Sequence, residues 1–408
     1  MPPLSQRCCQ SASVGENGGV NRADTADRAD AADREGGGVT GIGSATAGAA
    51  VGADLLAPRS HNTALVLDLL RTAGTAGISR LELAERTGLT PQAVSKITAR
   101  LRAEGLAAEA GRRASTGGKP RTVLRLEPGA GHAVGVHLDR DEVRVVLCDL
   151  AGAVLAEARS ALHLGAGADA VVERTARQVE ELLPGAPGSL LGVGVALPGP
   201  LDHARGVLHR VTGFPEWDGF PLRDALARRL GRPVVVDKDT NAAALGLAVA
   251  GEGDSFAYLH LGTGLGAGLV IGGSVHRGAR TGAGEFGHQV IQLDGPVCGC
   301  GARGCVEALC LAAVARGDLA EAARVLGTGA ANLVGLLDID LVLLGGRTVA
   351  TAPGEFVPGV AAVLAERARR KGTPGDAIPV RLAAGGSRGV ARGAAHLMLA
   401  PLFGRRDG

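Results

Sequence analysis

The sequence predicts an α/β protein: a small, basic, mostly helical domain followed by a larger domain of strands and helices. The first observation is the charge distribution. Residues 59–127 hold 12 Lys or Arg and 6 Asp or Glu, a net charge of +6, while residues 1–58 carry −3 and residues 128–408 carry −1. The second is that short apolar strands, glycine turns and helical stretches alternate from His132 onward. One basic module beside a nearly neutral remainder is typical of a protein in which a single domain binds a polyanion.

Length and composition exclude several classes of protein. The 408 residues suffice for two or three domains, and 46% apolar residues support sizeable cores. No apolar run is long enough to span a bilayer, so we expect no membrane protein. The chain does not open on a basic segment followed by an apolar one, so we expect no secretory signal and a cytoplasmic location. Residues 1–58 lack any helical or strand period, which predicts a disordered N-terminal extension.

Two helices are expected at the start of the basic domain. The first ends at Gly74 and carries an apolar stripe made of Leu65, Val66, Leu69 and Leu70. The second begins at the capping box Ser79-x-x-Glu82, ends at Gly88, and should turn Leu81 and Ala84 inward.

A third helix completes a helix-turn-helix. Thr90 is its expected N-cap and Pro91 its first residue, and the short turn from Gly88 to Thr90 joins it to the second helix. Its outward side chains can contact base edges or phosphates in a major groove: Gln92, Ser95, Lys96 and Arg100.

A basic loop follows the third helix. The expected strands Leu106–Gly111 and Thr122–Glu127 flank the segment GRRASTGGKPR, whose slim tip predicts a wing that enters a minor groove. Its basic residues are Arg112, Arg113, Lys119 and Arg121. The alternative is a solvated basic loop on a helical protein-interaction module.

The stretch from Gly284 to Glu307 contains a histidine and three cysteines at metal-ligand spacing. His288, Cys298, Cys300 and Cys305 are the donor set of a tetrahedral structural zinc site with no open position. Four of the seven cysteines of the chain fall between residues 298 and 310, so chance clustering is a poor explanation. The alternatives are three buried cysteines that happen to be close, or a disulfide.

The same stretch carries a family resemblance. The pattern His-x(9)-Cys-x-Cys-Gly-x-x-Gly-Cys-x-Glu over residues 288–307 resembles the signature of the ROK family of repressors, open reading frames and sugar kinases. Residues 78–106, followed by the segment GGKPR, resemble the winged helix of ROK repressors. The resemblance covers about residues 60–408. It implies a winged helix-turn-helix over 59–127 and, over 128–408, the two-lobed actin-like ATPase (ribonuclease H-like) fold of sugar kinases.

The nucleotide side of the family cleft is altered. Family kinases bind phosphates with an Asp-x-Gly-Gly-Thr turn, and the matching positions here include His137, Asp139, Arg140 and Asp141. The acid and both glycines are lost, and a carboxylate is added where phosphate charge would lie, so like charges would repel. We therefore expect no ATP binding and no enzymatic activity.

The sugar side of the cleft is better preserved. Residues 234–246 resemble the segment that carries the kinase base, a position that the resemblance assigns to Asp239. From the sequence alone, a cap for the helix beginning at Thr240–Asn241 explains Asp239 better than a catalytic role does. The preceding asparagine of the kinases is Lys238 here, which favours an anionic ligand. Glu285, His288 and Glu307 match the residues that hold sugar hydroxyls in the family. Carboxylates are suited to this role because each can accept two hydrogen bonds from hydroxyl groups.

Together these features predict a sugar-responsive DNA-binding transcriptional regulator, expected to be a repressor, of carbohydrate metabolism genes. Its degenerate kinase domain would sense the effector. The expected partners are operator DNA with an inverted repeat, a sugar or sugar phosphate, and further copies of the chain in a homodimer or homotetramer. Two alternatives remain open: an active ROK sugar kinase that also binds DNA, and a binding module without operator specificity.

Overall fold

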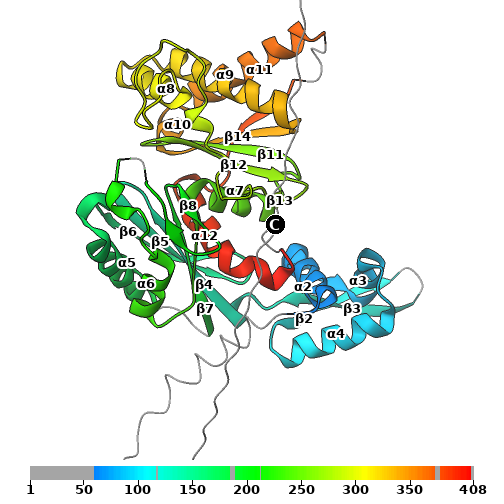
Figure 1. Ribbon diagram of the computed structural model, residues 1–408. Helices are drawn as coiled ribbons and strands as arrows, with labels where there is room; N and C mark the ends of the chain where they lie inside the picture. Colours follow the sequence, from blue (N-terminus) through cyan, green and yellow to red (C-terminus); the bar gives the residue numbers. More distant parts are fainter. Residues whose placement is uncertain (1–58, 116–117, 184–188, 212, 373–376, 406–408) are drawn as a thin grey trace, which may run out of the picture. The chain divides into compact units, whose positions relative to one another are not determined.

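The computed structural model describes residues 59–408 apart from 116–117, 184–188, 212, 373–376 and 406–408, and leaves out the side chains of residues 114, 115, 118 and 119. The disordered extension predicted for residues 1–58 lies outside the described residues. All described residues belong to the second of two structural units, Gly43–Gly408. Element labels are those of Figure 1.

The first described elements form a winged helix-turn-helix (blue to cyan in Figure 1). Three strands pair antiparallel in the order β1-β3-β2 beside three helices. The elements are α2 (His61–Ala73), β1 (Ile78–Ser79), α3 (Arg80–Thr87), α4 (Pro91–Ala103), β2 (Ala107–Ser115) and β3 (Gly118–Leu126).

The predicted helix boundaries are confirmed by their caps. The Ser79 hydroxyl accepts from the backbone N–H of Glu82, and the Glu82 carboxylate accepts from that of Ser79 at 2.8 Å. The Thr90 hydroxyl accepts from the backbone N–H of Ala93 at 3.2 Å.

One inward-facing assignment in this domain, that of Leu81, is wrong. Leu81 is 41% exposed, and Leu83, which is fully buried, supplies the core leucine of α3 together with Ala84. On α2 the buried stripe is Val66, Leu67 and Leu70, while Leu65 and Leu69 are only partly buried. The helix is rotated from the expected orientation because its buried face also packs on the C-terminal segment of the chain.

The wing is a longer hairpin than expected. Most of the segment predicted as a loop continues the ladder, since Arg112 pairs with Thr122 and Arg113 with Arg121. The tip at residues 116–117 lies outside the described residues.

The larger domain has two lobes with the same sheet plan. In each, three antiparallel strands are followed by two parallel ones, in the orders β6-β5-β4-β7-β10 and β13-β12-β11-β14-β15. The first sheet contains β4 (Gly131–Leu138), β5 (Glu142–Asp149), β6 (Val154–Ala161), β7 (Ser189–Leu197) and β10 (Val234–Lys238). The second contains β11 (Phe256–Leu261), β12 (Leu265–Ile271), β13 (Ser274–Val275), β14 (Leu341–Gly345) and β15 (Val380–Leu382). A small hairpin of β8 (Leu201–Asp202) and β9 (Val207–Leu208) follows β7.

Helices cover the outer face of each sheet. In the first lobe these are α5 (Ala168–Leu182) and α6 (Leu222–Leu230). In the second they are α8 (Val306–Ala315), α9 (Leu319–Leu337), α10 (Arg347–Thr351) and α11 (Pro353–Arg370). Two further helices, α7 (Asp239–Val249) and α12 (Gly389–Leu399), lie against each other between the sheets (Figure 1). The duplicated sheets with a central helix pair are the two-lobed architecture that the resemblance implied.

Within the described part of the chain, no helix combines the length and apolar character needed to cross a bilayer.

Candidate effector cleft, metal centre and DNA-binding surface

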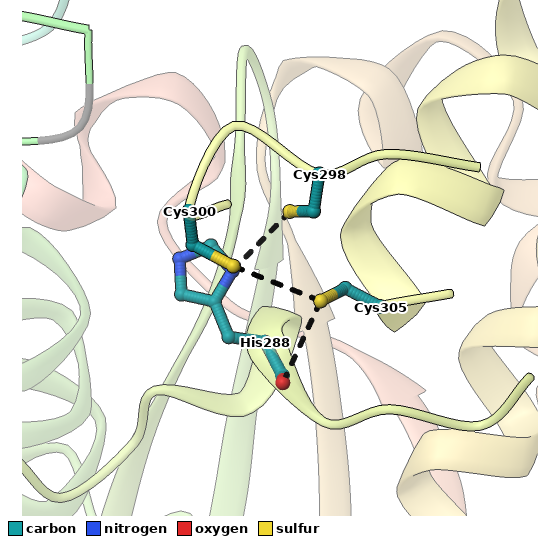
Figure 2. A group of neighbouring side chains, drawn as sticks. All are labelled: His288, Cys298, Cys300 and Cys305. Carbon is teal, nitrogen blue, oxygen red and sulfur yellow. Dashed lines mark hydrogen bonds between the residues drawn. The ribbon is translucent and has the colours of Figure 1, made fainter. Parts of the chain in front are cut away.

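The four predicted metal ligands come together in one cluster. His288 ends the short helix η6 (Phe286–His288), Cys298 and Cys300 lie in the following loop, and Cys305 is the N-cap residue of α8. Their donor atoms all lie within 4.8 Å of one another. Figure 2 shows the four side chains pointing toward a common centre.

The geometry fits a tetrahedral zinc ion. The Sγ atoms of Cys300 and Cys305 are 3.8 Å apart, and Cys298 Sγ is 3.6 Å from His288 Nδ1. Zinc with Zn–S of about 2.3 Å and Zn–N of about 2.1 Å in tetrahedral geometry requires about 3.8 and about 3.6 Å for these separations. Burial raises the pKa of Cys305 to about 12, so ionising this thiol calls for a cation beside it. The described cysteines are free thiols, which counts against the disulfide alternative.

Backbone contacts hold the metal loop in shape. Gly304 has φ of 66°, and a Cβ there would lie 1.5 Å from the carbonyl oxygen of Gln292. Only glycine fits this close approach. The backbone N–H of Gly304 donates to Pro296 O at 2.9 Å, and that of Cys298 to Ala302 O at 2.8 Å.

The predicted sugar ligands line one small cavity. A space of about 90 Å³ is bordered by Asp239 from the start of α7, Glu285 and His288 around η6, and Glu307 from the first turn of α8. Glu307 also accepts from the backbone N–H of Leu265 at 2.8 Å, which ties it to the glycine turn before β12. Asp239 is the first residue of α7 while Lys238 is its N-cap residue, so the carboxylate is not the helix cap. The cavity therefore brings together three carboxylates and a histidine from three separate segments of chain.

Lys238 forms an ion pair inside this cavity. Its Nζ donates to Glu285 Oε1 at 3.1 Å and to the carbonyl oxygen of Ala283 at 2.5 Å, and its side chain is 4% exposed. One of the carboxylates predicted to hold sugar hydroxyls is thus already paired with a cation. Other cavity residues that the sequence did not point to as ligands are Arg140, His260 and Thr263.

A carboxylate and guanidinium clasp occupies the region of the altered phosphate turn. Arg347 at the start of α10 donates to both oxygens of Asp141, at 2.8 and 3.0 Å, and lies 3.5 Å from Asp139. Asp139 also accepts from the Thr263 hydroxyl at 3.1 Å. Since Asp139 and Asp141 belong to the first lobe and the other two residues to the second, the clasp joins the lobes where family kinases hold phosphates. The nearby His137 is buried, which lowers the pKa of its imidazole, and its Nε2 has no hydrogen-bond partner.

A larger cavity of about 370 Å³ lies beyond the clasp. It shares Asp139 and His260 with the smaller cavity of about 90 Å³. Its lining includes the apolar residues Ala243, Leu247, Leu344 and Val390 together with four arginines: Arg144, Arg159, Arg347 and Arg392. With His137 and Asp139 in its lining, this cavity lies on the side of the cleft that corresponds to the nucleotide side of family kinases.

The predicted DNA contacts on α4 face solvent. Gln92, Ser95, Lys96 and Arg100 are all exposed, while Val94 and Leu101 are fully buried on the opposite face. Arg100 also donates to the Thr63 hydroxyl of α2 at 2.6 Å.

The basic residues of the wing differ in whether they are exposed or already paired with other protein groups. Arg112 and Arg121 are exposed. Arg113 pairs with Glu82 at 2.9 Å and donates to the carbonyl oxygen of Gly77, so it binds the wing to α3. The Lys119 side chain is not among those that the structure describes.

Comparison with known proteins identifies the family. Residues 133–317 match the ROK family model, and residues 65–107 match the winged helix-turn-helix DNA-binding model. A putative xylose repressor from Caldicellulosiruptor sp. (strain Rt8B.4) is 30% identical over 317 residues, which cover 66% of this chain and 79% of the relative. The chain belongs to the ROK family.

Both repressors and kinases occur among the ROK relatives. A glucokinase from Thermotoga maritima is 36% identical over 194 residues, 46% of this chain and 60% of that protein. A solved ROK family transcriptional regulator, a homologue of the E. coli MLC protein, superimposes with a TM-score of 0.67 and 22% identity over 84% of this chain and 97% of its own, and supports the fold. A kinase relationship alone leaves the winged helix unexplained, so the repressor interpretation fits these relatives best.

Proposed function

We propose that this ROK protein is a sugar-responsive transcriptional repressor of carbohydrate metabolism genes. The observation that carries the proposal is the joining of a winged helix to a sugar cavity whose phosphate region is filled by the Asp139, Asp141 and Arg347 clasp. A kinase needs that region for its nucleotide, whereas a sensor needs only the sugar cavity.

The effector is a sugar or sugar phosphate bound by Asp239, Glu285, His288 and Glu307. Carboxylates suit hydroxyl recognition because each oxygen accepts a hydrogen bond. Lys238 favours a phosphorylated sugar, because a phosphate group can replace Glu285 as the ion-pair partner of the Lys238 ammonium. The ligand regulates DNA binding only if it binds one arrangement of the protein better than the other.

His288, Cys298, Cys300 and Cys305 would hold one structural zinc ion. Bound there, the ion supplies a rigid cross-link between η6 and the start of α8, the two elements that present His288 and Glu307 to the cavity. Metal analysis of protein purified without chelator should give about one zinc per chain. A metal-free protein that melts like the untreated one would contradict this assignment.

The DNA-binding surface comprises the exposed residues of α4 and the wing. Gln92, Ser95, Lys96 and Arg100 would enter the major groove, and Arg112, Arg113, Lys119 and Arg121 would contact the backbone or minor groove. Two copies in a homodimer or homotetramer would bind an inverted repeat, because operator symmetry mirrors protein symmetry.

The proposal is tested by selecting duplexes from genomic fragments and titrating the bound complex with D-xylose, D-glucose and D-glucose 6-phosphate. We expect a preferred duplex, release by at least one probe, and at least tenfold weaker binding by Lys96→Glu, since a groove contact is worth about 1–3 kcal/mol. Arg205→Glu, an exposed site in the β8–β9 turn, is the matched control. A protein with no preference over bulk DNA would refute the function.

The second candidate is a sugar kinase that also binds DNA. It is favoured by the position of Asp239, which lines the sugar cavity where a catalytic base would be needed. Incubation with ATP and D-glucose decides between the two functions, because phosphorylation at an ordinary enzymatic rate requires the phosphate region that the clasp now fills.

A further inference from the structure

Helix α7 connects the sugar cavity to the winged-helix domain. Its first residue, Asp239, lines the cavity, and its last residue, Val249, accepts a hydrogen bond at its carbonyl oxygen from Arg71 Nη1 at 3.4 Å. Arg71 belongs to α2, the first helix of the winged-helix domain. At a rise of about 1.5 Å per residue, the ten steps from Asp239 to Val249 span about 15 Å.

Arg71 has three kinds of contact. Its guanidinium donates to Asp68 Oδ1 at 2.9 and 2.7 Å, and stacks over the ring of Phe403 at 5.2 Å from the centroid. Its side chain is only 8% exposed. Phe403 lies in η9 (Ala400–Phe403), which directly continues α12. Arg71 therefore meets the C-terminal ends of both central helices.

The two central helices are packed backbone to backbone. A Cβ at Gly393 of α12 would lie 1.9 Å from the carbonyl oxygen of Ala242, and one at Gly268 of β12 would lie 2.1 Å from that of Thr240. Every residue of α7 from Thr240 to Val249 is buried. Because the backbones touch at these glycines and the surrounding side chains of both helices are packed in one buried cluster, a shift of α7 is passed to α12 rather than taken up locally.

Within the winged-helix domain, α2 contacts α4, the recognition helix whose exposed residues are expected to contact DNA. Thr63, in the first turn of α2, accepts from Arg100 of α4 at 2.6 Å. Arg100 is one of the residues expected to contact DNA. A change in the position of α2 thus alters the setting of α4 directly.

We propose that α7 transmits occupancy of the sugar cavity to the DNA-binding domain, and that Arg71 is the coupling residue that receives it. This inference rests on the proposed repressor function. A ligand held by Asp239 biases the position of α7, and with it the contacts of Arg71 to Val249 and Phe403. The shift reaches α4 through α2, so ligand and DNA bind with a mutual free-energy coupling.

The test compares wild type, Arg71→Met and Arg71→Lys in the full chain. Methionine keeps length and packing but removes every donor, and lysine keeps the charge and one donor direction. For each protein the duplex Kd is measured with and without the saturating probe that releases the wild type, and the Kd of that probe is measured in the absence of DNA. Arg125→Met is the control, because Arg125 pairs within the winged-helix domain, with Glu127 at 3.7 Å.

We expect Arg71→Met to bind duplex and probe within about threefold of wild type. The ratio of duplex Kd values with and without probe should fall from the about 5–150-fold typical of allosteric coupling to nearly one. Arg71→Lys should give an intermediate ratio and Arg125→Met the wild-type ratio.

An unchanged ratio in Arg71→Met overturns the inference and leaves the repressor function intact. Loss of duplex binding in both Arg71 variants, with normal zinc content and melting, also overturns it, since Arg71 would then support DNA binding rather than coupling. A wild type without a preferred duplex or without a ligand effect refutes the proposed function itself, and the coupling falls with it.

Discussion

Replacing Arg277 tests how the sugar cavity is supported. Arg277 Nε donates to Asp237 Oδ2 at 2.7 Å, and both side chains are 2% exposed. The other oxygen of Asp237 accepts from the backbone N–H of Lys238 at 2.7 Å and from the Asn241 amide at 2.9 Å. The pair thus holds the junction of β10 and α7 that presents Asp239 to the cavity.

The expected cost of Arg277→Met follows from burial. Removing one partner of a buried ion pair leaves an uncompensated charge and costs about 3–5 kcal/mol. At about 2–4 °C per kcal/mol the melting temperature should fall by about 6–20 °C, toward the lower end for a chain of this size. Asp237→Asn combined with Arg277→Met should recover part of the loss, because neither member of the pair then carries a charge.

Calorimetry or circular dichroism on the purified chain measures the effect. The control is Arg369→Met, whose pair with Glu366 is 58% and 48% exposed and is worth at most about 1 kcal/mol. If Arg277→Met melts within the range of the Arg369 control, the argument from an uncompensated buried charge is wrong.

Three further outcomes are expected. Arg347→Glu places like charges at the clasp and should lower the free energy of unfolding by about 1 kcal/mol, measured by urea denaturation. Adding Asp141→Arg should restore the stability, and a double mutant no more stable than the single one would count against the clasp. Lys238→Asn frees Glu285, so titration calorimetry should show a preference shifted at least tenfold from D-glucose 6-phosphate toward D-glucose, as a charged hydrogen bond is worth about 1.5–3 kcal/mol. Burial, reinforced by Arg392, Arg71 and Arg405, lowers the pKa of His396 from 6.5 to about 3. The unfolded chain therefore binds the extra proton between these pH values, and stability present above pH 6.5 is lost on acidification. His396→Gln should flatten the stability profile below pH 6.5, and an unaltered acid slope would contradict this.

Features encoded by neighbouring residues were predictable without the fold. The caps at Ser79 and Thr90 depend on hydrogen bonds between residues three positions apart. The exposed face of α4 follows from the helical period of its apolar residues. His288 and Cys305 are 17 residues apart, close enough for spacing to indicate a shared ion. The orientation of α2 was not predictable, because the face it buries depends on the C-terminal residues Leu402 and Phe403 that cover it.

The sequence by itself determined a basic winged helix, a zinc-type ligand set and an altered phosphate turn, since each is local in the chain. Only the tertiary structure decided which charges meet. Arg347 reaches Asp141 across 206 residues, Lys238 reaches Glu285 across 47, and Arg71 reaches Val249 across 178. Such pairs depend on the path of the whole chain rather than on spacing, because an ion pair or hydrogen bond forms only where folding brings its atoms within about 3 Å. The proposed coupling between the sugar cavity and the recognition helix belongs to this second class.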